Sequence, residues 1–275
     1  MTWAPLEAPL GLAPPRPITV RAQAIPARRY FAEHAHPWHQ IVYATSGVLT
    51  VAIEGRSLVI SSEQAVWLPT GVRHRVGSLL GAAFRSLWIA DEAGRGVAER
   101  PTVLAVQPLL RALILEAVAI EGQESQDGYA DRVGALILDQ LRRAQPVPGS
   151  LPWPCGGPLV GLCEGLYADP ADPRGPEDWG RELGMSGRTL ARRFAAEVGL
   201  SLRSWRRRLR LFKAIELMGG GLNVTQTAMQ LGYASTSAFV FAFRTGIGRT
   251  PQAYMREQGA GGPGRSVPQF SEPGA

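Results

Sequence analysis

The feature that most constrains this chain is a change in the spacing of its apolar residues near Pro101. From residue 17 to residue 100, short runs of β-branched, aromatic and aliphatic residues are separated by turns. After residue 107, apolar residues recur every three or four positions, as on one face of an amphipathic helix. The sequence therefore predicts a multidomain α+β chain, with a β part first and an all-α part at the C-terminus.

The N-terminal runs are typical of antiparallel strands. Residues 48–53 and 57–60, for example, flank Glu54-Gly55, which is a tight-turn signal. No helical pattern interrupts the series. Short strands at this spacing favour an antiparallel barrel or sandwich.

Proline and glycine divide the chain further. Five prolines and three glycines fall between Gln145 and Pro158, a composition typical of an interdomain linker. Apolar stripes predict two helices before it, at residues 107–121 and 129–143. The predicted segments are a disordered arm (1–16), a β-barrel domain (17–100), a helical pair (101–145), a linker (146–158), an all-α domain (159–258) and a disordered tail (259–275).

Length and composition exclude several classes of protein. The 275 residues suit two domains, and a hydrophobic content of 45% excludes a wholly disordered chain. Two cysteines, Cys155 and Cys163, cannot build a disulfide framework or a zinc finger. No apolar run is long enough to span a membrane and no signal-peptide pattern begins the chain, so a cytoplasmic protein without a membrane partner is expected.

The positive charge of the chain is concentrated in its last third. The whole chain has a net charge of +6, whereas residues 174–258 alone contain 14 Lys+Arg against 6 Asp+Glu. This imbalance predicts a polyanion partner for one domain only. A solvated arginine-rich surface is the alternative, and codon usage contributes to the arginine excess, since Lys213 is the only lysine.

The first of two helix-turn-helix patterns lies in residues 176–194. Gly184 ends one helix, and Ser186 is a good N-cap for the next. The apolar residues of that second helix face inward, whereas Arg188 and Arg192, four residues apart, face outward. Such a helix is suited to the major groove of DNA, where each outward arginine can donate two hydrogen bonds to a guanine.

The second pattern, in residues 224–243, repeats this plan. Ser235 caps its second helix, and Phe239 and Phe243 face inward. The outward side chains are small or apolar, which suits thymine methyl groups. Between the two patterns, a long helix carries an arginine cluster suited to phosphates: Arg206, Arg207, Arg208 and Arg210.

Several motifs of the last third occur together: Ser186-Gly187-Arg188-Thr189-Leu190-Ala191-Arg192-Arg193-Phe194, Gly199-Leu200-Ser201, Trp205, Gly232-Tyr233-Ala234-Ser235-Thr236-Ser237-Ala238-Phe239, Phe243-Arg244, Gly248, Thr250-Pro251 and Tyr254. Over residues 159–257 they closely resemble the DNA-binding domain of the AraC/XylS family of bacterial transcription regulators. The resemblance implies seven helices, two of which enter successive major-groove segments on one face of the DNA.

The resemblance also assigns roles to individual residues. By position, Arg188, Ala191 and Arg192 are base-facing in the first pattern, although Ala191 is too short to hydrogen-bond a base. The DNA-binding residues that we expect are Arg188, Thr189, Arg192, Arg207, Arg210, Ser235, Thr236, Ser237, Val240, Phe241 and Arg244.

The four histidines all lie in the β part. Residues 33–40 (Glu-His-Ala-His-Pro-Trp-His-Gln) and residues 69–74 resemble the two motifs of the cupin barrel, so a cupin or jelly-roll fold is implied. Metal-binding cupins use two histidines one residue apart, a glutamate and a later histidine. Here those places hold His34, His36, Gln40 and His74.

This histidine cluster has two interpretations. His34 and His36 would point to the same side of a strand, and with His74 they suit a divalent metal such as zinc, nickel or iron. Glutamine in place of glutamate weakens the case for redox metal chemistry and favours an interior that binds an organic effector. The effector-binding residues that we expect are His34, His36, Trp38, His39, Gln40 and His74.

Two functions of different classes follow. The first is a transcription regulator that is not an enzyme, with a small-molecule or metal effector in the barrel and double-stranded promoter DNA on the all-α domain. The helical pair resembles the family's dimerisation element, so a homodimer is expected; the alternative is that the pair packs only against the barrel. RNA polymerase is expected as a further partner. The alternative function is a metal-dependent cupin enzyme, an oxygenase or isomerase, with a helical appendage.

Overall fold

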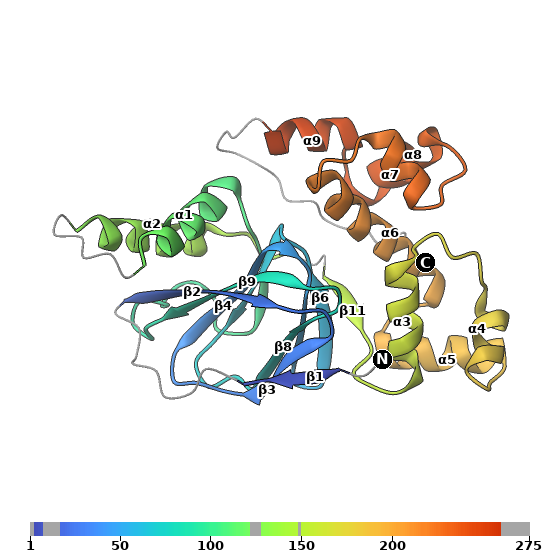
Figure 1. Cartoon of the computed structure of the whole chain (residues 1–275), viewed down its shortest axis with the longest axis horizontal. Coiled ribbons are helices and arrows are strands. Elements are labelled where there is room, and N and C mark those ends of the chain that lie inside the picture. Colours follow the sequence, from blue (N-terminus) through green and yellow to red (C-terminus); the bar gives the residue numbers. More distant parts are fainter. Residues whose placement is uncertain (1–2, 8–16, 122–127, 148–149, 260–275) are drawn as a thin grey trace. The chain divides into compact units, whose positions relative to one another are not determined.

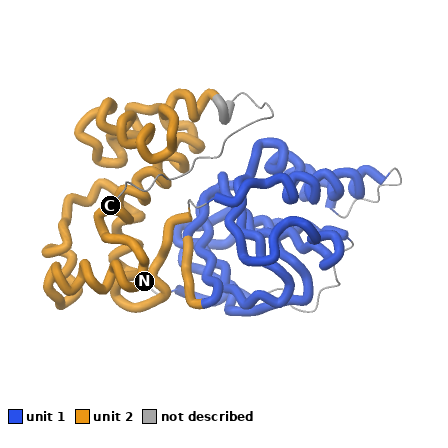
Figure 2. Tube along the Cα trace, turned by 180° about the vertical axis from the view of Figure 1, so that it is seen from behind, with its two compact units in different colours: residues 1–54, 59–147, 263–267 blue, residues 55–58, 148–262, 268–275 orange. Residues whose placement is uncertain are grey.

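The structure is a computed structural model that describes residues 3–7, 17–121, 128–147 and 150–259. The chain divides into two compact units (Figure 2). One is built mainly from residues 1–54 and 59–147, and the other mainly from residues 55–58 and 148–262. No helix of the described residues combines the length and apolar character that crossing a bilayer requires.

Two β-sheets form most of the first unit (Figure 1). One sheet consists, in spatial order, of β10 (Thr102–Ala105), β7 (Gln64–Leu68), β4 (His39–Gly47), β9 (Ala82–Ile89) and β2 (Ile18–Ile25). The other has the order β1 (Ala4–Leu6), β3 (Arg29–His34), β8 (His74–Ser78), β5 (Leu49–Ile53) and β6 (Arg56–Ile60). The pairs β10–β7, β7–β4, β4–β9, β9–β2, β3–β8 and β8–β5 are antiparallel, whereas β1 is parallel to β3. The predicted antiparallel β domain is confirmed as two jelly-roll sheets rather than one closed barrel.

Three short strands depart from the predicted segments. β1 lies in the arm predicted to be disordered, β10 at the start of the predicted helical pair, and β11 (Leu151–Trp153) in the predicted linker. Each has three or four residues, too few for a period to show in the sequence, and each is defined by backbone pairing. The other parts of these predictions, at residues 1–2, 8–16, 148–149 and 260–275, lie outside the described residues.

Two helices cover one face of the first sheet: α1 (Pro108–Ala119) and α2 (Tyr129–Arg143). Ile114 and Ile137 are fully buried in a cluster with Leu87 of β9. The predicted helical pair is therefore confirmed. Two residues of its predicted apolar stripes, Leu109 and Leu136, are nevertheless 53% and 47% exposed.

The second unit is helical after β11. Its helices are α3 (Pro158–Ala168), α4 (Pro176–Glu182), α5 (Gly187–Val198), α6 (Leu202–Gly219), α7 (Val224–Gln230), α8 (Thr236–Ile247) and α9 (Pro251–Gly259). The seven helices that the family resemblance implies over residues 159–257 are thus found. Gly199 and Gly248 end α5 and α8 at φ +77° and +82°, in the left-handed region that favours glycine.

The long helix α6 links two small cores. Near its start, the buried Trp205 ring lies 5.7 Å from the rings of both Phe194 in α5 and Trp153 in β11. Towards its end, Leu211 is buried in one cluster with Phe239 and Phe243 of α8. Aromatic burial therefore fixes both α5 and α8 against the same helix.

Candidate functional site

The first helix-turn-helix consists of α4 and α5. The Ser186 hydroxyl caps α5 by accepting a hydrogen bond from the Thr189 amide at 3.2 Å. The capped helix buries Leu190 completely, whereas Arg188 and Arg192 are exposed. The structure therefore places both predicted base-reading arginines at the surface of α5, and Thr189 in the cap.

A close approach between the two helices depends on glycine. A Cβ on Gly180 of α4 would lie 2.7 Å from the Met185 carbonyl oxygen and 3.0 Å from the Gly187 nitrogen. Any larger residue at position 180 would push the turn away from α4. The tight turn thus fixes the direction of α5 relative to α4.

The second helix-turn-helix consists of α7 and α8. The Ser235 hydroxyl accepts a hydrogen bond from the Ala238 amide at 3.1 Å, and so is occupied as the N-cap of α8. On that helix Ser237 and Phe241 are exposed, the phenyl ring by 67%. The remaining predicted DNA-binding residues of this helix are half-buried or exposed: Thr236, Val240 and Arg244.

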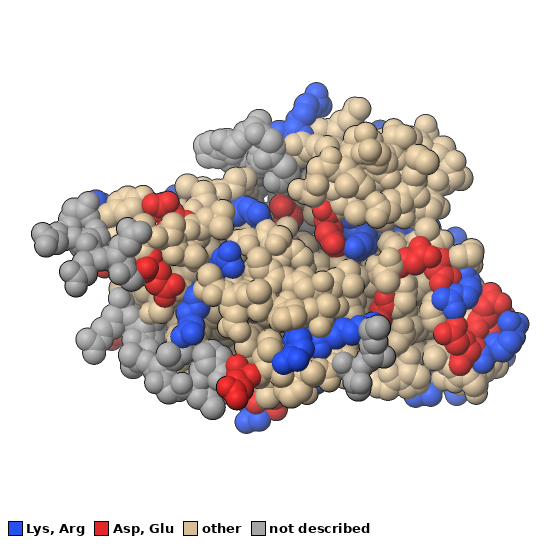
Figure 3. Space-filling model, in the orientation of Figure 1, with Lys and Arg blue, Asp and Glu red and all other residues tan. Residues whose placement is uncertain are grey.

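The surfaces of the two reading helices differ in charge. α5 presents several arginines, whereas the exposed side chains of α8 are mainly small or apolar. In the view of Figure 3, the surface over α7 and α8 carries few charged side chains. The predicted asymmetry between the two halves is therefore present in the structure.

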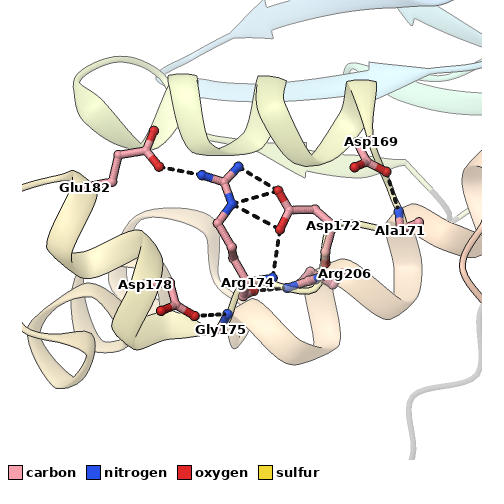
Figure 4. A network of polar contacts seen from close by, with 8 residues as sticks. All are labelled: Asp169, Ala171, Asp172, Arg174, Gly175, Asp178, Glu182 and Arg206. Carbon is pink, nitrogen blue, oxygen red and sulfur yellow. Dashed lines mark hydrogen bonds and ion pairs between the residues drawn. The ribbon is translucent and has the colours of Figure 1, made fainter.

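The arginine cluster of α6 is partly used within the unit (Figure 4). Arg206 donates hydrogen bonds to the backbone carbonyls of Asp172 and Arg174. Arg210 donates through Nε to the Pro170 carbonyl at 2.9 Å, and its guanidinium lies 5.6 Å from the centre of the Tyr233 ring. These two arginines hold the segment between α3 and α4 in place. Their guanidinium groups are thus already engaged with backbone carbonyls, unlike those of arginines that serve phosphates alone.

An ion-pair network holds the same segment. Arg174 pairs with Asp172 at 2.6 Å and with Glu182 at 2.5 Å, and its guanidinium lies 3.7 Å from the centre of the Trp179 ring. Hydrogen bonding from Arg174 lowers the pKa of the Asp172 carboxyl. Sequence reasoning missed this network, because its members are ordinary charged residues whose partners are set by the fold.

Three of the four histidines converge in the first unit. Candidate ligand nitrogens of His34, His36 and His74 lie within 4.8 Å of one another. β3 ends at His34, which pairs in register with His74 of β8, and His36 lies in the following loop. The prediction that His34 and His36 share a strand is wrong, because β3 ends before His36, yet the loop brings that ring back to the other two.

Hydrogen bonds orient all three rings. Nδ1 of His34, His36 and His74 lies 2.7, 3.0 and 2.9 Å from the carbonyl oxygens of Ala32, Trp38 and Val72, respectively. A carbonyl only accepts, so Nδ1 of His34 and of His74 carries the hydrogen, and in these neutral rings Nε2 holds the lone pair. Both nitrogens of His36 face oxygens that only accept, so its neutral ring donates to one of them at a time. Nε2 of His74 is buried and has no partner among the described residues. His36 Nε2 lies 2.8 Å from the side chain of Gln40.

Burial keeps two of these rings neutral. Desolvation lowers the pKa of His74 from 6.5 to about 4, against a backbone hydrogen bond that raises it. Desolvation also lowers the pKa of His36. A neutral imidazole is the form in which histidine binds a metal, through the ring nitrogen that carries the lone pair.

A cavity of about 190 Å³ lies beside these histidines, between the two sheets. Its residues come from β2, β3, β4, β8, β9 and the loop before β4: Arg21, Gln23, Phe31, His34, Ala35, His36, Pro37, Trp38, Gln40, Val76, Phe84, Ser86 and Trp88. Four predicted effector-binding residues line it, namely His34, His36, Trp38 and Gln40. Sequence reasoning missed Arg21, Phe84 and Trp88, since nothing in one sequence shows that β2 and β9 are neighbours.

His39 does not line the cavity, contrary to expectation. Its ring stacks on Trp67 at 4.7 Å between centroids, and its Nδ1 accepts a hydrogen bond from the Thr70 amide at 3.2 Å. Strand geometry explains the difference, because neighbouring residues of β4 point to opposite faces and Gln40 takes the inner one. His39 therefore belongs to the outer face of the sheet.

Comparison with known proteins matches both units. Residues 17–131 match a family model described as an AraC-like ligand binding domain, and residues 179–257 match one described as a helix-turn-helix domain. The transcriptional regulator NimR of Escherichia coli is 30% identical over 225 residues, which cover 81% of each chain. The chain belongs to the AraC/XylS family.

Two further proteins match the chain to different extents. RipA of Corynebacterium glutamicum, also a transcriptional regulator, is 32% identical over 126 residues, or 46% of this chain and 36% of RipA. The solved structure of ToxT from Vibrio cholerae has a TM-score of 0.38 and 14% identity, and covers 88% of this chain and 98% of ToxT.

Membership of the AraC/XylS family identifies a DNA-binding transcription regulator with an N-terminal ligand-binding domain. The two matched regions correspond to the two sites. The cavity and its histidines lie inside residues 17–131, and both reading helices lie inside residues 179–257. The regulator predicted from the sequence is therefore favoured over the cupin enzyme.

Proposed function

We propose that α5 and α8 read promoter DNA and that a ligand in the cavity of the first unit controls this binding. One observation carries the proposal that these helices read DNA. Each helix is capped, buries an aromatic residue on its inner side and leaves its predicted base-reading side chains exposed or half-buried. We also propose that the protein acts in the cytoplasm, where a DNA partner is available, and that it regulates without catalysis.

The two helices would read different base pairs. Arg188 and Arg192 on α5 suit guanine, to which a bidentate arginine contributes about 1–3 kcal/mol of discrimination. Ser237 and Phe241 on α8 suit thymine methyl groups and single hydrogen bonds. We therefore expect an operator with a G·C-containing segment and an A·T-containing segment, about one helical turn apart.

Mutation of one base-reading and one backbone-contacting arginine tests this assignment. Arg192→Ala should lose about 1–3 kcal/mol at one or two positions of the operator and leave other positions unchanged. Arg207 is a half-buried residue of α6. Arg207→Ala should weaken binding evenly across operator sequences and reduce the slope of log affinity against log salt concentration by about one. Binding measured by fluorescence anisotropy on a matched set of operator variants distinguishes them. Equal effects of both substitutions on all variants would contradict the assignment.

We infer that His34, His36 and His74 can hold a divalent metal such as zinc, nickel or iron. Three observations support the fit: the clustered nitrogens, the Nδ1–carbonyl hydrogen bonds of His34 and His74, and the unpartnered Nε2 of His74 among the described residues. Such second-sphere hydrogen bonds orient the histidines of metal sites. The metal would supply a Lewis-acidic centre next to the cavity, and Gln40 would contribute a neutral oxygen rather than a charge.

Zinc titration of the purified full-length protein tests the metal site. The wild type should bind one equivalent, and free zinc at 100 times its Kd should stabilise the first unit by about 2.7 kcal/mol. The double variant His34→Ala/His36→Ala should bind none, whereas His39→Ala should retain one equivalent, since His39 faces away. Retention of zinc by the double variant would contradict the proposed metal site. It would not bear on the proposal that α5 and α8 read DNA.

We further propose that α1 and α2 mediate a homodimer, and that RNA polymerase is a partner of the DNA-bound protein. The exposed apolar side chains of the pair support the first of these, because Leu109, Leu115 and Leu136 remain at least 42% exposed. Ligand binding would then bias how two DNA-binding units are presented, with a coupling free energy of about 1–3 kcal/mol.

A further inference from the structure

The charge of the cavity wall narrows the class of ligand. Of the described residues that line the cavity, only Arg21 belongs to the strongly charged types, and none is an aspartate or glutamate. Among the described residues, the wall therefore presents one permanently charged side chain, which is positive, and no carboxylate to a bound molecule.

Among the described residues, Arg21 is held in place without a carboxylate partner. It pairs in register with Ser86 of β9, and its guanidinium carbon lies 5.0 Å from the centre of the Trp88 ring. Within the described part of the chain it makes no side-chain hydrogen bond or ion pair. Burial raises the pKa of Glu121 and the charge of Arg21 opposes this, so the two groups interact without forming an ion pair.

The rest of the wall is mainly apolar. Phe31, Val76, Phe84, Trp38 and Trp88 supply most of the surface. The volume of about 190 Å³ far exceeds the roughly 10–15 Å³ that one water molecule needs. The space thus suits a small organic molecule with an apolar body.

Few neutral polar groups are left for a ligand to use. Gln40 donates to the Ser86 hydroxyl at 2.6 Å and contacts His36, so these side chains already satisfy one another. The indole N–H of Trp38, in contrast, is buried without an acceptor among the described residues. A cation would be repelled by Arg21, whereas an anionic oxygen would accept hydrogen bonds from Arg21 and from the unpaired indole N–H more strongly than a neutral hydroxyl would.

We propose that the effector is a small carboxylic acid with an aromatic or short aliphatic body, whose carboxylate is held by Arg21 and whose body packs against Trp88 and Phe84. This proposal rests on the proposed role of the cavity as the effector site. Arg21 would be the residue that selects acids over neutral molecules of the same shape, because a charge-assisted hydrogen bond in a partly buried site is stronger than a neutral one.

Matched acids and amides test the proposal. The probes are phenylacetate and hexanoate, with phenylacetamide and hexanamide as neutral counterparts of the same size. Binding to the full-length protein is measured by calorimetry in EDTA, so that a bound metal contributes nothing to carboxylate affinity. Each acid should bind at least about tenfold more tightly than its amide.

Substitutions locate the selectivity. Arg21→Gln should remove the tenfold preference for the acids and leave the amide affinities unchanged, whereas Arg21→Lys should restore part of it. Arg75→Gln is the matched control, because Arg75 also lies over an aromatic ring, 5.4 Å from the centre of Tyr30, but does not line the cavity. Circular dichroism and the thermal midpoint check that each variant is folded.

Two results would overturn the proposal. One is equal affinity for acids and amides, and the other is failure of both acids to bind at 10 mM, which is about a thousand times a typical effector Kd of about 10 μM. Operator binding by the same preparation is measured in parallel. If it persists while the acids fail, the proposal on ligand class is wrong and the role in transcription stands.

Discussion

Arg206 and Arg207 illustrate how the same residue type acquires different roles one position apart. Both carry the same charge and lie in the same helix, α6, and the sequence predicts both as phosphate contacts. In the structure Arg206 turns inward to the carbonyls of Asp172 and Arg174. The sequence cannot distinguish the two arginines, because those carbonyls lie more than 30 residues away and any residue type supplies a carbonyl.

The inward position predicts a cost for losing Arg206. Arg206→Ala leaves the backbone carbonyls of Asp172 and Arg174 without their charged donor, so it should lower the free energy of unfolding of the second unit by about 1–3 kcal/mol. Arg203→Ala, an exposed arginine of the same helix, should change it by less than about 0.5 kcal/mol. Urea unfolding followed by tryptophan fluorescence measures both. Similar values for the two variants would mean that Arg206 is not a brace.

Residues in regular elements were easier to place than residues in loops. The helical period correctly put Leu190 inside and Arg192 outside. The same kind of argument failed for His36, because β3 ends at His34 and the strand predicted to join the two histidines stops before His36. Convergence of three histidines was predicted by resemblance, but the residues that complete the cavity come from strands paired at long range.

At the scale of the elements, helix boundaries followed from capping chemistry. Ser186 and Ser235 begin α5 and α8 as predicted, since a serine oxygen satisfies an amide that the first turn leaves unpaired. The short strands β10 and β11 were missed because backbone pairing with a distant strand, rather than their own apolar period, makes them strands.

The helical pair α1–α2 carries a prediction of its own. Leu136→Asp places a charge on an exposed apolar side chain of α2, so it should convert the proposed dimer to a monomer without unfolding the first unit. Leu80→Asp is the control, because Leu80 is similarly exposed, at 52%, in the turn between β8 and β9. Sedimentation at micromolar concentration measures the mass. A Leu136→Asp variant that stays dimeric would exclude this face as the dimer contact.

At the scale of the whole molecule, the chain consists of a ligand-binding unit followed by a DNA-binding unit. The division between the units falls at residues 147 and 148, inside the predicted linker (146–158), and the two matched family models lie on either side of it. The sequence also predicted that DNA is read by two helices rather than one, because both helix-turn-helix patterns carry their own cap and aromatic core.

Selection of operators from a random DNA library tests that central claim most directly. The full-length protein should select two blocks of sequence whose centres lie about one helical turn apart. Arg188→Ala/Arg192→Ala should erase only one block, and Ser237→Ala/Phe241→Ala should erase only the other. Selection of a single block, or loss of the same block in both variants, would show that α5 and α8 do not read DNA together.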